Sequence, residues 1–535
     1  MKKIKFLLIA SIGIFTIISC DITKLENAFD NFGLIIGLKP INTSATIILT
    51  DAKTGELINT TVETTFIGDN ESFVIDTFSD PLKSNTSTNG ILDFGINNTI
   101  TPTEQNPFKI RLKLTAPGYK DKEQTISILE TGSSNFTISM VNLSNPPVGI
   151  IINESSVASI SSEGITNEDI NISITDMDTD TNTEVGVNIS IPKGTLFTDS
   201  NENPLSGELR ANTTFYNSSK TLAVKEIDER LLENVNDSTL VVVSAVQMNL
   251  KDSSGNSLTS TKNKTVYQQK NTGNYIIGFI LNSSTFSELQ QVLRLAYISP
   301  STAERFILYT VPEVQTLSNG RVELRYLLND NLIRNMALVY FSEQPCNSIL
   351  KINRNGNLGK ISIEITEKGF RRDVDIQENS NTTSLKNITK GAKKITIRLP
   401  FETIEQNVDL CGSTSKTIDL PAMPPALIDA TIKVLLTCPN TDDKLRVTDI
   451  PAASVVYREK NAPPGTAWRV ATDLNWVYNS ETNILESASC RINGVEVGKN
   501  YTIKVSYDNS TKEKDVLISG SLVEYNETVD ASFCN

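Results

Sequence analysis

Histidine is absent from all 535 residues, tryptophan occurs only twice, and aromatic residues make up 6% of the chain. The absence of histidine excludes Ser-His-Asp and Cys-His catalysis and histidine-bound zinc. It also removes the commonest general base near neutral pH. Acidic residues outnumber basic ones, with 62 Asp and Glu against 49 Lys and Arg, so the net charge is −13. A nucleic-acid partner is therefore not expected, since phosphate binding needs a basic surface. We predict no catalytic residues, no metal ligands and no cofactor.

Long apolar runs are missing as well, except at the N-terminus. Residues 6–18 form one apolar run, and Lys2, Lys3 and Lys5 precede it. As a helix, a run of this length rises about 20 Å, whereas the hydrocarbon core of a membrane is about 30 Å thick. A basic start followed by a short apolar segment is typical of a signal peptide, which we place at residues 1–19.

The apolar run ends in Ile17-Ile18-Ser19-Cys20, which resembles the lipobox of bacterial lipoproteins. In that family, acyl chains such as palmitate are attached to the cysteine, and the signal peptide is cut just before it. The resemblance implies that Cys20 is the lipidated N-terminus and that the membrane is a partner. It also implies export and anchoring in the bacterial cell envelope, for which we expect the outer membrane, while its periplasmic or surface face stays open. Residues 20–39 would form a lipidated tether or a short helix.

Most of the remaining chain consists of short segments in which apolar and polar residues alternate, such as 46–49, 109–114, 361–365 and 502–505. Clusters of Asp, Asn, Ser and Gly separate these segments, a pattern typical of β-sandwiches. Helical patterns occur at 223–234 and from Thr285, where Glu288 completes a capping box. We predict a mainly β chain of tandem sandwiches, with a larger central β-rich domain that carries a few short helices.

Residues 45–128 resemble the carboxypeptidase-regulatory, or transthyretin-like, β-sandwich. The resemblance depends on the order of short motifs, namely an Asp-x-x-Thr-Gly turn, a second glycine turn and a strand that ends in Gly-aromatic. These elements are Asp51, Thr54, Gly55, Leu57 and Val62; then Thr88, Asn89, Gly90 and Phe94; then Phe108, Ile110, Leu112, Gly118 and Tyr119. The resemblance implies a β-sandwich of the kind used as a spacer or accessory module.

The segment 109–120 recurs at 360–371 almost in step, and residues 501–505 form a looser copy without the glycine. Recurrence over hundreds of residues indicates repeated domains, because a solenoid has a much shorter period. We predict a transthyretin-like sandwich at 40–143, a central β-rich domain at 144–340, and two cysteine-bracketed sandwiches at 341–427 and 428–535.

Five cysteines follow Cys20, and all of them lie in the last 190 residues. In this interpretation Cys346 and Cys438 open the two C-terminal domains in similar contexts, and Cys411 and Cys534 close them. We therefore predict the disulfides Cys346–Cys411 and Cys438–Cys534, which an exported protein can form. Cys490 is left over, and its pairing with Cys438 remains an alternative.

The two tryptophans, Trp468 and Trp476, lie close to Tyr478 in the sequence. On one extended strand these three positions share a face, which would provide a stacking platform for a sugar ring. The alternative is packing in the core of the last sandwich, because aromatic residues are few and each sandwich needs some.

The sequence as a whole favours a membrane-anchored envelope protein that is not an enzyme. It would bind or scaffold another envelope protein or a glycan, presented on a stalk of sandwiches with the cysteine-bracketed domains at the distal end. The alternatives are a carboxylate-based glycoside hydrolase, for which histidine is unnecessary, and a glycan-binding surface lipoprotein.

Overall fold

The computed structural model describes residues 41–534 with short gaps. The gaps are at 77–79, 179–182, 200, 233–238, 257, 259, 264–274, 290–291, 299–304, 309–310, 319, 329–334, 343–345, 358–360, 368–369, 377–379, 389–391, 400–401, 412–413, 423, 425–426, 441–442, 444, 446–453, 464–465, 480–481 and 508–509. The predicted mainly β fold class is confirmed, because sheets dominate the described chain and only two short α-helices accompany them.

The first sandwich packs two four-stranded sheets, ordered β3-β5-β1-β8 and β4-β2-β6-β7, around one apolar core. Alternate side chains of β1, namely Ala45, Ile47 and Leu49, point into this core. Its strands are β1 (Thr43–Asp51), β2 (Val62–Ile67), β3 (Val74–Ile75), β4 (Ser84–Ser87), β5 (Ile91–Ile96), β6 (Phe108–Thr115), β7 (Lys122–Ile128) and β8 (Gly132–Met140), with a 3-10 turn, η1 (Glu71–Phe73), after β2.

The turn motifs of the first sandwich have specific geometric roles. Asp51 accepts hydrogen bonds from the backbone amides of Lys53 and Thr54, both at 2.9 Å, and its second oxygen accepts one from the Tyr119 hydroxyl at 3.3 Å. The Asp-x-x-Thr-Gly turn and the Gly-aromatic motif therefore meet in space. Gly90 has φ +76°, and a Cβ there would lie 2.9 Å from the Leu49 carbonyl oxygen, so only glycine fits this turn.

The central domain packs a five-stranded sheet, ordered β10-β11-β16-β20-β19, on a six-stranded sheet, ordered β18-β17-β21-β14-β13-β9. A two-stranded ribbon, β12-β15, completes it. The elements are β9 (Ile150–Ile160), β10 (Ile170–Asp178), β11 (Thr183–Ile191), β12 (Thr195–Thr198), β13 (Gly207–Asn217), α3 (Thr221–Glu226), η2 (Glu229–Leu231), β14 (Thr239–Lys251), β15 (Ser260–Asn263), β16 (Tyr275–Asn282), α4 (Ser283–Leu289), β17 (Leu293–Ile298), β18 (Arg305–Leu308), β19 (Glu313–Leu317), β20 (Arg321–Leu328) and β21 (Asn335–Ser342).

Both predicted helices exist, but their boundaries differ from the expectation. The helix expected at 223–234 ends at Glu226, because the side chain of Asp228 accepts a hydrogen bond from the Arg230 amide and starts the separate turn η2. The second helix begins at Ser283 rather than at Thr285. The predicted capping box is therefore wrong, because Asn282 accepts the hydrogen bond from the Ser284 amide at 2.7 Å.

The third and last sandwiches share the connectivity of the first. In each, the first strand pairs in parallel with the last strand: β1 with β8, β22 with β28, and β29 with β36. The third has strands β22 (Cys346–Asn353), β23 (Ile361–Glu367), β24 (Phe370–Ile376), β25 (Thr382–Ile388), β26 (Ala392–Arg398), β27 (Thr403–Asp409) and β28 (Ser415–Asp419). The last has β29 (Leu427–Thr437), β30 (Ser454–Glu459), β31 (Arg469–Val470), β32 (Thr472–Asn479), β33 (Ile484–Glu496), β34 (Asn500–Tyr507), β35 (Ser510–Leu517), β36 (Leu522–Thr528) and η4 (Ala531–Phe533).

The sequence repeat only partly follows this shared connectivity. In the first and last sandwiches, β6 and β34 occupy equivalent places, in sheets ordered β4-β2-β6-β7 and β31-β30-β34-β35. The closer copy, at 360–371, contains β23, which pairs with β24 and β26 instead. The looser copy, in β34, is thus the structural equivalent of β6. An alternating pattern indicates an inner strand of a sandwich but does not indicate the position of that strand in the connectivity.

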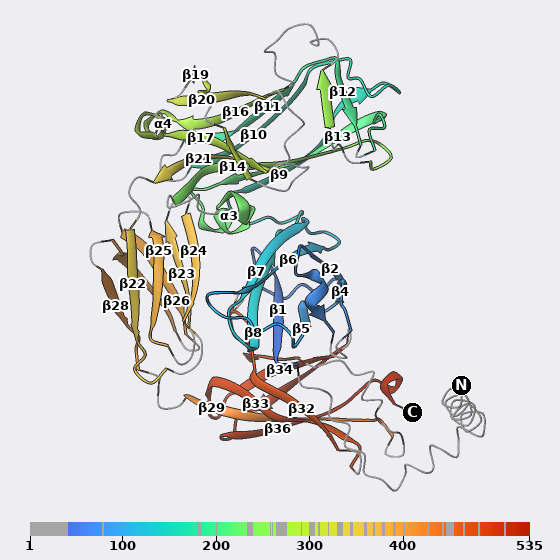
Figure 1. Cartoon of the computed structure of the whole chain (residues 1–535), viewed down its shortest axis with the longest axis vertical. Coiled ribbons are helices and arrows are strands. Elements are labelled where there is room, and N and C mark those ends of the chain that lie inside the picture. The colour runs from blue at the N-terminus through green and yellow to red at the C-terminus, as the bar shows by residue number, and fades with distance from the viewer. Residues whose placement is uncertain are drawn as a thin grey trace, which may run out of the picture.

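The four domains do not form an extended row (Figure 1). The last sandwich lies against the first, with β34 next to it, and α3 lies where the central domain, the first sandwich and the third sandwich meet (Figure 1). The predicted stalk with distal C-terminal domains is therefore wrong. The reason is that the first and last sandwiches each carry an apolar outer sheet face, and these two faces bury each other.

Candidate functional site: the two junctions of the first sandwich

The segment between β13 and β14 connects three domains. Its apolar side chains, including Ala223, Ile227 and Leu231, pack on the outer face of the six-stranded sheet. Its charged side chains point the other way, toward the neighbouring sandwiches. The local sequence has this amphipathic pattern because Lys225, Glu226, Asp228, Glu229 and Arg230 surround Ile227.

Ion pairs from this segment reach two neighbouring domains. Glu226 pairs with Lys122 of β7 at 2.8 Å, and only 3% and 14% of these two side chains are exposed. The Glu229 carboxylate accepts hydrogen bonds from the Thr125 amide and from Gln124, also on β7. In the other direction, Lys225 pairs with Glu364 of β23 at 2.7 Å. One short segment therefore holds the first and third sandwiches against the central domain.

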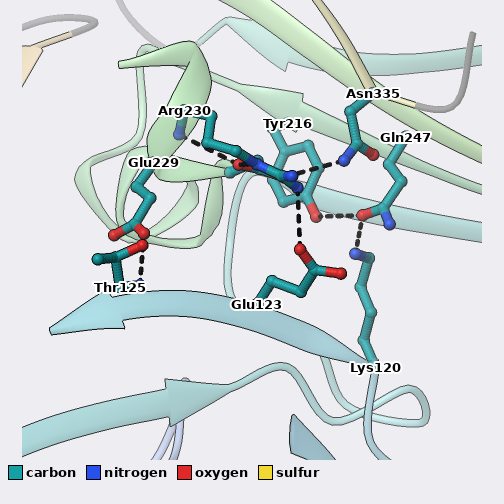
Figure 2. A network of polar contacts seen from close by, with 9 residues as sticks. Lys120, Glu123, Thr125, Tyr216, Glu229, Arg230, Gln247 and Asn335 are labelled. Atoms are coloured by element: carbon teal, nitrogen blue, oxygen red, sulfur yellow. Dashed lines mark hydrogen bonds and ion pairs between the residues drawn. The ribbon is translucent and has the colours of Figure 1, made fainter. Parts of the chain in front are cut away.

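Around this segment, a polar network crosses from the first sandwich to the central domain (Figure 2). Arg230 lies between Asp228, at 2.6 Å, and Glu123 of the first sandwich, at 3.3 Å. The hydrogen bond with Asp228 is the main cause that raises the pKa of Arg230 above its usual range. Asn335 of β21 donates a further hydrogen bond to Asp228 at 2.9 Å, which fixes this carboxylate.

Lys120 reaches from the first sandwich into the central domain (Figure 2). Its ammonium group donates to Gln247 Oε1, and the Tyr216 hydroxyl approaches the same oxygen at 3.5 Å. Burial lowers the pKa of Lys120 to about 8, although Asp228 and Glu226 partly oppose this shift. Burial also raises the pKa of Tyr216. Lys120 thus binds a partner on the facing domain, which is the arrangement of a docking interface.

The second junction joins two sheet faces, those of β5-β1 in the first sandwich and β30-β34 in the last. Side chains alternate between the two faces of a strand, and Ile47 of β1 and Val455 of β30 occupy the cores of their own sandwiches. Ile48 and Val456 must therefore point outward. They are nevertheless only 4% and 0% exposed, because they pack against each other's domain together with Ile91.

Polar contacts surround this apolar patch. Arg458 pairs with Glu56 of the first sandwich at 2.9 Å, and Asn89 donates a hydrogen bond to Ser506 at 3.0 Å. Trp468 lies within the patch and is 6% exposed. The guanidinium of Arg458 lies 4.5 Å from its ring centroid, and the ammonium of Lys504 lies 4.6 Å away.

The predicted sugar platform is wrong for Trp468, because its ring is buried between two domains and two cations. The assumption of a single strand is also wrong. Trp468 directly precedes β31, whereas Trp476 and Tyr478 belong to β32 in the opposite sheet, opposite Ser487 and Leu485 of β33. The alternative, packing in the core of the last sandwich, is also wrong for Trp468, because its ring belongs to the apolar patch between the first and last sandwiches.

The disulfides Cys346–Cys411 and Cys438–Cys534 form as predicted, with Cα separations of 5.6 and 6.0 Å. Their positions differ from the expectation, because Cys411 precedes the last strand β28 and Cys438 directly follows the first strand β29. The bonds therefore lie at opposite ends of equivalent parallel strand pairs. The alternative bond from Cys490 to Cys438 is wrong, since Cys490 is a buried thiol in β33.

Cys20 and the expected tether lie outside the described residues. Among the described residues, no helix is both long and apolar enough to cross a membrane, and no group of three or more acidic or cysteine side chains could hold a metal ion.

Comparison with known proteins gives only weak likenesses. No family model and no curated protein matches the chain. Among solved structures, the TIE protein of Bacillus anthracis is similar at 9% identity and a TM-score of 0.15, over 72% of this chain and 58% of that one. The chain thus spans less than two thirds of that structure. The major pilin subunit BcpA of Bacillus cereus is similar at 7% identity and a TM-score of 0.14, over 91% of this chain and 99% of that one. Scores this low support no functional conclusion.

Apart from Trp468, the junction residues are not among the predicted site residues, although two patterns in the sequence could have identified them. Ile47-Ile48-Leu49 and Val455-Val456-Tyr457 are continuous apolar runs, which are typical of strands buried on both faces. The dense charges at 225–230 lie beside apolar positions, which is typical of a helix with partners on two sides.

Proposed function

We propose that this protein is an exported lipoprotein, anchored in the bacterial cell envelope through acylated Cys20, and that it acts as a non-enzymatic scaffold or binding protein. The lipobox and the signal-peptide pattern support the anchor and the location. The mainly β fold, in which sandwiches are joined by buried junctions, supports the scaffolding role.

One observation carries the scaffolding proposal. The first sandwich, which follows the proposed anchor directly, contacts both the central domain and the last sandwich. An anchored chain with this arrangement would hold a compact block of four domains close to the membrane. Several titratable groups with shifted pKa values are engaged in contacts between domains, as Lys120 and Arg230 show. Such groups serve cohesion in this protein.

Replacement of Cys20 by serine tests the anchor. We expect Cys20→Ser to leave the signal peptide uncleaved by the lipoprotein peptidase and to abolish labelling by radioactive palmitate. Fractionation of cells should then show loss of the acylated membrane-bound form. A Cys490→Ser variant is the matched control, because it removes a cysteine that cannot carry the anchor. Unchanged labelling of Cys20→Ser would contradict the proposal.

The non-enzymatic role has its own test. The purified chain without its anchor should show no turnover when it is screened against glycans and peptides. Turnover that a single Asp or Glu substitution abolishes, while the fold stays intact, would contradict this part of the proposal and leave the anchor unaffected.

A further inference from the structure

Asp93 is a carboxyl group of the first sandwich that lies in the contact with the last sandwich. It lies on β5 two residues after Ile91, so its side chain is on the same outer face as that buried isoleucine. The Thr46 hydroxyl donates a hydrogen bond to Asp93 Oδ1 at 2.7 Å. From the last sandwich, Ser454 of β30 faces Asp93, and its buried hydroxyl makes no hydrogen bond of normal geometry.

The cations of this contact are engaged with other groups. Arg458 of β30 pairs with Glu56 at 2.9 Å, and Lys504 of β34 pairs with Glu513 of β35, also at 2.9 Å. Burial raises the pKa of Asp93 from 3.8 to about 6, while the Thr46 hydrogen bond and the nearby Ser454 hydroxyl oppose this shift, and no charged side chain is among its causes. The last sandwich therefore partly covers a carboxylate without neutralising it.

We propose that the contact between the first and last sandwiches is a proton-dependent latch, which closes as Asp93 takes up a proton from solvent and loosens as Asp93 ionises. In the closed state, the protonated carboxyl donates a hydrogen bond to Ser454 Oγ and still accepts one from Thr46. Both groups are then satisfied, and no charge is buried. The latch is a property of the folded chain and does not depend on acylation of Cys20.

The sign and size of the effect follow from the two pKa values. In the open state, the outer face of β5 is exposed to water, and Asp93 has its ordinary pKa. Closing raises this value, so closing takes up a proton and becomes more favourable as the pH falls. The opening constant is the equilibrium ratio of chains with an open contact to chains with a closed one. With a pKa of Asp93 of about 6 in the closed state and 3.8 in the open state, this constant should fall about tenfold between pH 7.5 and pH 5.

Thiol labelling at a buried position of the contact measures this opening constant. We use the mature chain with Cys20→Ser and Val456→Cys, since Val456 is fully buried between the two domains and cysteine is of similar size. The labelling rate with dithiodipyridine, divided by the rate of the urea-unfolded chain at the same pH, gives the opening constant. The parent without Val456→Cys supplies the background from Cys490. We expect the constant to fall about tenfold from pH 7.5 to pH 5.

Two further variants separate the latch from general stability. Asp93→Asn imitates the protonated group, so its opening constant should be independent of pH and no higher than the pH 5 value of the Val456→Cys chain. Glu56→Gln removes the ion pair with Arg458 and should increase opening at both pH values, with the ratio between them unchanged. An opening constant of the Val456→Cys chain that is independent of pH would overturn the latch. The same conclusion follows if Asp93→Asn retains the pH dependence, or if labelling never exceeds the Cys490 background.

Discussion

At the scale of single residues, each of the two junctions of the first sandwich contains a titratable group of that sandwich whose pKa is shifted by burial, and the two groups carry opposite charges. Burial lowers the pKa of Lys120 to about 8 on the side of the central domain and raises the pKa of Asp93 to about 6 on the side of the last sandwich. At neutral pH both groups are mostly charged, so both junctions bear the cost of a buried charge. Acid relieves this cost at one junction, and base relieves it at the other.

The pH dependence of Lys120→Met tests the junction with the central domain. In wild type, the folded chain loses the proton of Lys120 near pH 8, whereas the unfolded chain keeps it until about pH 10.5. Stability from this group therefore rises with pH across that window. The urea midpoint of wild type should rise relative to that of Lys120→Met between pH 7.5 and pH 9.5. The urea midpoint of Lys113→Met, a variant at an exposed position of β6, should instead show the same pH dependence as that of wild type. Parallel curves for wild type and Lys120→Met would contradict the buried amine.

At the scale of elements, the alternation of apolar residues predicted strands and sandwiches correctly, because each domain core is built from one face of each sheet. It could not predict which outer faces are covered. In β21, Met336, Ala337, Leu338 and Val339 are all fully buried, because the central core takes one face while α3 and its neighbours cover the other. The helical pattern at 223–234 placed the connecting segment correctly. Its role depends on Lys122 and Glu364, which are more than 100 residues away along the chain.

Removal of Glu226 tests the connecting segment. Glu226→Ala leaves Lys122 without its carboxylate in a nearly buried position, and loss of one partner of a buried pair costs about 3 kcal/mol or more. Glu208→Ala is the matched control in the same domain, because Glu208 pairs with Arg210 on the surface, with 43% of its side chain exposed. Loss of this exposed pair should change the free energy of unfolding very little, because solvent screens its charges. Chemical denaturation measures both values, and equal losses would show that the segment does not stabilise the junction.

The two disulfides can be removed separately. In the chain-entropy model, the bonds Cys346–Cys411 and Cys438–Cys534, with sequence separations of 65 and 96, each stabilise by about 4 to 5 kcal/mol. Each double serine variant should lose up to this amount in denaturation experiments, and the loss should concern its own sandwich, as local hydrogen exchange reports. Cys490 should stay unlabelled in the native protein and react after unfolding. Native labelling of Cys490 would contradict its position in the core.

At the scale of the whole molecule, the sequence could predict repeated sandwiches and both disulfides, because these depend on local patterns and on the order of the cysteines. It could not predict that the last sandwich packs against the first. That contact depends on matching two outer faces, with Ile48 and Ile91 on one side and Val456 and Trp468 on the other. Each of these residues is compatible with an ordinary core when only its own domain is considered. The stalk model failed for this reason.

Small-angle scattering distinguishes the closed arrangement from a row of domains. A fully compact chain of about 500 residues has a radius of gyration of about 24 Å, whereas four separate domains of about 130 residues placed end to end reach about 40 Å. Because the first sandwich contacts both the central domain and the last sandwich, we expect a value below about 30 Å for the mature chain with Cys20→Ser.

Trp468→Ala removes the largest side chain of the apolar contact and the ring that Arg458 and Lys504 approach, so it should increase the radius of gyration, whereas Trp468→Phe should increase it less. The thermal transitions of the other domains should stay unchanged in both variants, which separates release of the last sandwich from general unfolding. A wild-type value near 40 Å, or a Trp468→Ala variant as compact as wild type, would show that the last sandwich is not held against the first through this patch.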